Sequence, residues 1–66
     1  MSPHQYRAAL AKLDISQVKA AQLLGVDPRT SRAWALEQAR IPHSVAILLR
    51  LMVAKKITVD DVENVK

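Results

Sequence analysis

The 66-residue chain contains no cysteine, a single glycine and only two aromatic residues, Tyr6 and Trp34. The lack of cysteine excludes disulfides, on which many domains of this size depend for stability. A structural zinc site is almost excluded, because His4 and His43 are the only histidines and lie far apart in the sequence. A β-rich domain would need several glycine-bearing turns and more aromatic residues, whereas here half of the residues are apolar, with many alanines and leucines. We therefore expect an all-α domain, for which association between copies is the remaining source of added stability.

Acidic residues are scarce in most of the chain. Residues 1–56 hold nine basic and three acidic residues, a net charge of +6, whereas residues 57–66 hold one basic and three acidic residues, a net charge of −2. A basic body suggests a polyanionic partner, although many small domains are equally basic.

Several classes of protein are excluded by what the sequence lacks. The most apolar stretch, 45–54, is too short to span a bilayer and is interrupted by Arg50, and the first 15 residues lack the apolar core of a signal peptide. The chain has no nucleophile–base pair at motif spacing, no glycine-rich phosphate loop and no metal-binding cluster. We expect a soluble, cytoplasmic protein without catalytic residues, cofactor, membrane contact or evident small-molecule ligand.

Capping and helix-breaking residues divide the chain into five predicted helices. The first begins after Ser2, where Ser-Pro-His-Gln has the pattern of a capping box, and ends near residue 13. The second runs from a cap at Ser16 to Gly25, and the third begins at Asp27-Pro28 and extends to about residue 39, since no breaker precedes Pro42. The fourth spans about 42–55, and a short fifth helix follows a cap at residue 58.

The segment 16–39 carries the most specific pattern. Ala21 is small enough for two helices to cross closely, Gly25 supplies the backbone geometry of a tight turn, and Trp34 can fold back onto the core. The second helix of the pair then exposes Arg29 and Arg32, three residues apart, on one face. This arrangement is typical of a helix-turn-helix.

A known family shares these features over about residues 3–56. The matching residues are Leu13-Asp14-Ile15-Ser16-Gln17, Ala21, Leu24-Gly25-Val26, Arg29-Thr30, Trp34, Ile41-Pro42 and 45–52. With them the chain resembles the Cro/C1-type (XRE-like) helix-turn-helix regulators of bacteria and phages. The resemblance implies one lambda-repressor-like domain of five helices over residues 1–66. It also implies a sequence-specific regulator of transcription, a repressor or autoregulator that binds a palindromic operator in double-stranded DNA as a homodimer.

The resemblance and the charges together give candidate DNA contacts. The candidates for base contact are Arg29, Arg32, Asp27, Pro28 and Ala33. The candidates for phosphate contact are Ser16, Gln17, Lys19, Thr30 and Arg40. An alternative role for Asp27 is to cap its helix. Ser31 stands where the family usually has a buried Val or Ile, so we expect its hydroxyl to bond to a carbonyl one turn back. Ala33 stands where related proteins often have a long polar side chain.

The fourth predicted helix has more apolar residues than one core face needs. One stripe comprises Val45, Leu48, Leu49 and Met52, and a second comprises Ile47, Leu51 and Ala54. Two interpretations of the second stripe stay open: the fifth helix covers it, or it forms a homodimer interface together with Val62. A rival function follows from the second stripe, namely an antitoxin-like or adaptor module that binds protein through its fourth and fifth helices.

Overall fold

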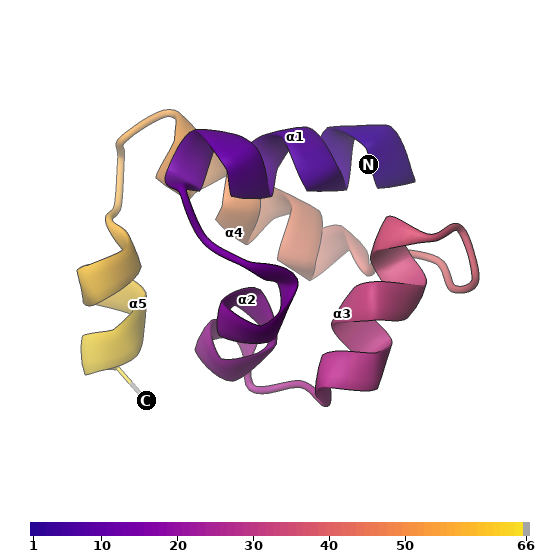
Figure 1. Cartoon of the computed structure of the whole chain (residues 1–66). Helices are drawn as coiled ribbons and strands as arrows, with labels where there is room; N and C mark the ends of the chain where they lie inside the picture. The colour runs from indigo at the N-terminus through magenta and orange to yellow at the C-terminus, as the bar shows by residue number, and fades with distance from the viewer. Residues whose placement is uncertain (66) are drawn as a thin grey trace.

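The computed structural model describes residues 1–65, and within them it contains five α-helices and no strand (Figure 1). The helices are α1 (Pro3–Leu13), α2 (Gln17–Leu24), α3 (Pro28–Ala35), α4 (His43–Val53) and α5 (Val59–Asn64). The expectation of an all-α fold with five short helices is confirmed. The sequence places the short fifth helix within residues 57–66, and the last residue of that segment lies outside the described residues.

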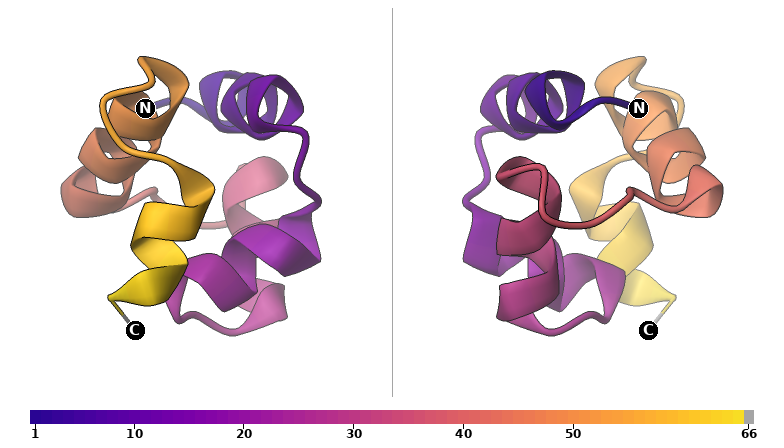
Figure 2. Two further views of the ribbon diagram at one scale, coloured as in Figure 1. Left: turned by 90° about the vertical axis from the view of Figure 1, so that its left-hand side faces the viewer. Right: turned by 90° about the vertical axis from the view of Figure 1, so that its right-hand side faces the viewer.

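The helices enclose one apolar core. Helix α1 packs on α4 and α3, α2 packs on α3, and α5 lies against α2 on the side away from α3 (Figures 1 and 2). The core side chains come from all five helices, with Tyr6, Leu23, Trp34 and Leu49 among the most buried. Trp34 is therefore a core residue, as the sequence predicts. None of the helices in residues 1–65 has the length and apolar character needed to cross a membrane.

The predicted helix starts are confirmed by their caps. Ser2 and Thr58 each accept a hydrogen bond from the backbone three residues ahead, and the side chain at that position bonds back to them. The Ser16 hydroxyl accepts from the Lys19 amide at 3.0 Å. These caps satisfy backbone amides that have no partner within the helix. The fourth helix was predicted to begin at Pro42, but α4 begins at His43, because Pro42 is its N-cap, and no side-chain bond caps it.

Four helices end in the same way. Each is followed by a residue with positive φ, namely Asp14, Gly25, Glu37 and Lys55, with φ between 56° and 71°. In each case the next amide donates to the carbonyl five residues earlier, at 2.9–3.1 Å. This is the Schellman arrangement, which satisfies carbonyls at a helix end and usually places glycine at the left-handed position. Only one of the four positions is glycine here.

The prediction that the third helix continues to about residue 39 is wrong. Helix α3 ends at Ala35, Glu37 takes a left-handed conformation, and the Gln38 amide bonds to the Ala33 carbonyl. The Arg7 guanidinium of α1 also donates to the Ala35 carbonyl. A cation at this end of a helix stabilises the exposed carbonyls and the negative end of the dipole. The fourth helix likewise ends at Val53, two residues early, because Lys55 is left-handed.

Candidate nucleic-acid interface

The α2–turn–α3 unit is built around a three-residue turn, Gly25-Val26-Asp27. Gly25 has φ 71°, and a Cβ added to it would meet nothing within 4 Å, so the requirement for glycine is conformational and not steric. The Val26 amide donates to the Ala21 carbonyl at 2.9 Å, and the Val26 side chain packs against the core. Ala21 is fully buried. These contacts hold α2 and α3 in close packing.

The inner face of α3 is fixed to α1. The Tyr6 and Trp34 rings meet edge to face, with centroids 5.7 Å apart and an angle of 83° between their planes. Ser31 is wholly buried, and its hydroxyl lies 2.5 Å from the Tyr6 hydroxyl. The partner of Ser31 is thus a tyrosine of another helix, and not the carbonyl of its own helix that the sequence suggested. Burial raises the pKa of the Tyr6 hydroxyl, and its hydrogen bond with Ser31 opposes that rise in part.

The outer face of α3 carries the two arginines. Arg29 and Arg32 are both exposed, whereas Ser31, Trp34 and Ala35 on the other side of the helix are buried. Two arginines one helical turn apart are therefore exposed on a helix whose opposite face packs in the core.

The other predicted base contacts surround this pair. Pro28 is exposed at the first position of α3, and Ala33 is half-buried. The Asp27 carboxylate accepts a hydrogen bond from the Arg29 amide at 2.8 Å. The structure thus places Asp27 in the capping role that was its alternative.

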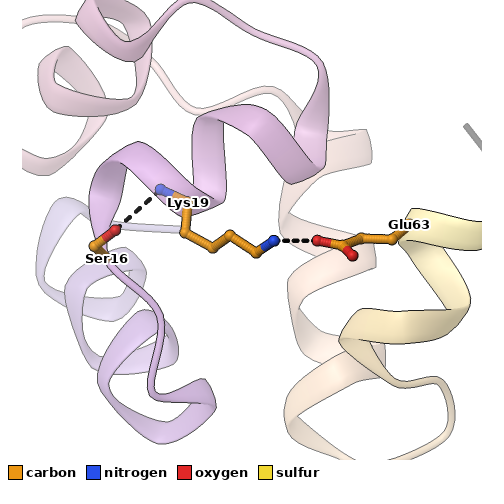
Figure 3. Close-up of polar contacts among 3 residues, drawn as sticks. All are labelled: Ser16, Lys19 and Glu63. Atoms are coloured by element: carbon orange, nitrogen blue, oxygen red, sulfur yellow. Dashed lines mark hydrogen bonds and ion pairs between the residues drawn. The ribbon is translucent and has the colours of Figure 1, made fainter.

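The start of α2 holds several of the predicted phosphate contacts. Gln17 is the first residue of the helix and is half-buried, and the exposed Ser16 caps it. Lys19 forms an ion pair with Glu63 of α5, as Figure 3 shows together with the Ser16 cap. The side chains of Lys19 and Glu63 remain 42% and 39% exposed, so water screens this pair. A phosphate would have to compete with Glu63 for Lys19.

The remaining two phosphate candidates lie apart from the start of α2. Thr30 is half-buried on α3, and Arg40 is exposed in the connection between α3 and α4. Arg7, a basic residue that no sequence motif indicates, lines a surface hollow together with Ser16 and Gln17. Its position depends on how α1 packs, which no local motif encodes.

The second apolar stripe of α4 is exposed. Ile47 and Leu51 are 45% and 39% exposed, and Ala54 is exposed at the end of the helix. Helix α5 packs on α2, so the interpretation that α5 covers this stripe is wrong. Val62 is only 8% exposed and belongs to the core of this chain. Its side chain is therefore not exposed beside Ile47 and Leu51, where the sequence placed it in a homodimer interface.

Comparisons with known proteins add no further assignment. No protein-family model matches the chain, and neither a curated protein nor a solved structure matches it. Within residues 1–65, no three His, Asp or Glu side chains lie together in a way that could hold a metal ion. The arrangement of charged residues on α2 and α3 is therefore the main guide to function.

Proposed function

We propose that this protein binds double-stranded DNA in a sequence-specific manner through the exposed face of α3 and regulates transcription, most simply as a repressor or autoregulator. The observation that carries the proposal is the exposed Arg29–Arg32 pair on a helix whose opposite face is anchored in the core. An α-helix fits the major groove, where arginine makes bidentate bonds to guanine. The net charge of +6 over residues 1–56 supports attraction to a polyanion.

In the proposed complex the two helices have different tasks. Arg29 and Arg32 read bases, each contributing about 1–3 kcal/mol of discrimination. Ser16 and Gln17 at the start of α2 position the protein on a phosphate, where free backbone amides and the helix dipole favour an anion. Two copies paired through Ile47 and Leu51 would read half-sites about 34 Å apart, the spacing of one turn of DNA.

The test is to select bound duplexes from a random pool at about 0.15 M salt and sequence them. We expect a palindromic consensus, and we expect Arg32→Ala to weaken binding to that consensus by about 5- to 150-fold, the equivalent of 1–3 kcal/mol, with a smaller loss on random DNA. Arg50→Ala removes the same charge from α4 and serves as the matched control. If no sequence is enriched, or if the two variants lose affinity equally on both kinds of DNA, the proposal is wrong.

A further inference from the structure

A groove between α1 and α4 is not used by the proposed DNA contacts. Its apolar lining comprises Met1, Ala8, Ala9, Val53 and Ala54, and its polar lining comprises Gln5, Lys12 and Arg50. Its volume is about 300 Å³, and it is open to solvent. Because three of the five apolar lining residues are alanines, a helix laid along the groove could approach closely.

The groove continues toward α5. A second hollow, lined by Leu13, Met52 and Ile57 among others, shares Lys12 and Val53 with the first and adds Lys55 at its edge. On α1 alone the groove extends from Gln5 to Lys12, which is about 10 Å of helix, or two turns. This length suits a partner helix that presents apolar residues at positions i, i+3 or i+4, and i+7.

The charges around the groove have one sign. Lys12, Arg50 and Lys55 line the two hollows, and none of their lining residues within 1–65 is acidic. A second copy of this chain, placed over the groove by a two-fold axis, would set the same cations against each other. A partner helix with an apolar strip flanked by carboxylates complements both the apolar lining of the groove and its cations. Like-charge repulsion disfavours a basic partner helix.

We propose that the α1–α4 groove binds an amphipathic helix of a partner protein whose polar side is acidic. The proposal does not depend on DNA binding. In Figure 2 the turn between α2 and α3 lies at the lower edge of the molecule, with α1 and α4 above it, so a helix in the groove would leave the outer face of α3 open. The protein would then link two partners: an acidic helix at one end and a polyanion at the other.

The experiment uses a fluorescein-labelled synthetic helix of about four turns, with leucine at the i, i+4 and i+7 positions and glutamate on both flanks. Its affinity is measured by anisotropy, and its site is mapped by amide chemical shifts on the full chain. Two further peptides serve as controls: one of identical composition with the leucines scattered, and one with lysine in place of glutamate. We expect binding of the first peptide alone, with shifts at Ala8, Ala9 and Ala54.

Paired variants separate the groove from general charge attraction. Lys12→Glu/Arg50→Glu should weaken binding about tenfold or more, whereas Arg40→Glu/Lys56→Glu, with the same change in net charge outside the groove, should change it less than about twofold. Ala8→Gln, which fills the groove without changing charge, should also weaken binding. The proposal is overturned if the peptide does not bind or if both charge-reversal pairs weaken it equally. It is also overturned if the shifts map to α3, or if raising the concentration of the protein alone shifts the amides of Ala8, Ala9 and Ala54, which would place a second copy in the groove.

Discussion

The buried hydrogen bond between Tyr6 and Ser31 offers the sharpest test of how α3 is held. Tyr6→Phe keeps the ring and its contact with Trp34 but leaves the Ser31 hydroxyl without its partner in a fully buried position. An unsatisfied buried hydroxyl costs about 1–3 kcal/mol. Ser31→Ala leaves the buried Tyr6 hydroxyl without its hydrogen-bond partner, so it should lower the free energy of unfolding by a similar amount. The double variant removes both polar groups, so its loss should be smaller than the sum of the two single losses.

The expected coupling is the amount by which the double variant's loss falls short of the sum of the two single losses. It is large compared with the total stability of so small a domain. At about 0.05–0.15 kcal/mol per residue, a chain of this length has roughly 3–10 kcal/mol in total. A coupling of about 1–2 kcal/mol lies within the range measured for residues in direct contact. Each kcal/mol lost should lower the melting temperature by about 4–8 °C. Either single variant should therefore melt well below the parent protein.

The assay is urea unfolding of the parent and the three variants, followed by far-ultraviolet circular dichroism. Ser44→Ala, which alters an exposed serine on α4, is the matched control and should add its effect to that of Tyr6→Phe without coupling. If the Tyr6→Phe and Ser31→Ala losses add to within about 0.5 kcal/mol, the two hydroxyls do not stabilise each other. The hydroxyl pair would then contribute nothing as a pair, and α3 would be held by apolar packing together with the bond from Arg7 to the Ala35 carbonyl.

Three further predictions concern a helix end, the pH dependence and the ion pair. Glu37→Gly should raise the free energy of unfolding by up to about 1 kcal/mol, because a left-handed backbone strains a residue with a Cβ; equal stability of Glu37→Gly and Glu37→Ala would contradict this. Because its pKa is raised in the folded state, Tyr6 binds its proton more tightly there than in the unfolded chain. The free energy of unfolding should therefore fall as the pH rises above 10.0, the ordinary pKa of tyrosine. If the urea midpoint of Tyr6→Phe falls as steeply over the same pH range, the Tyr6 hydroxyl is not the cause. Glu63→Gln should increase DNA affinity up to about fivefold, because it releases Lys19 from the ion pair. Asp60→Asn, which removes the same charge outside the pair, should increase it less. Equal effects in a filter-binding titration would mean that only net charge matters.

The helix starts were predictable from the sequence because their determinants are local. Ser2, Ser16, Asp27 and Thr58 each bond to a backbone amide two or three residues ahead, and such a pattern is visible in the sequence. The helix ends were predictable only where glycine or aspartate stands at the left-handed position. Glu37 and Lys55 adopt the same conformation without a sequence signal, so the third and fourth helices were predicted too long.

The contacts that complete the site join residues distant in the sequence. Ser31 and its partner Tyr6 are 25 residues apart, and Lys19 and Glu63 are 44 apart. The opposite charges of residues 1–56 and 57–66 do not specify which residues meet. The sequence likewise does not determine which helix α5 packs on, because its valines fit an apolar surface on either α2 or α4. Only the packing of whole helices decides these points.

The pairing of Tyr6 with Trp34 has a consequence for experiments on this molecule. The chain contains one tyrosine, one tryptophan and no phenylalanine, so both of its optically useful side chains lie at the junction of α1 and α3. At 5.7 Å between ring centroids, excitation of the tyrosine should pass efficiently to the tryptophan while α3 stays docked. The intrinsic fluorescence of the unlabelled protein therefore reports on one helix junction, the one behind Arg29 and Arg32. A ligand that moves α3 relative to α1 should change the energy transfer from Tyr6 to Trp34. A ligand that binds elsewhere and leaves this junction in place should not change it.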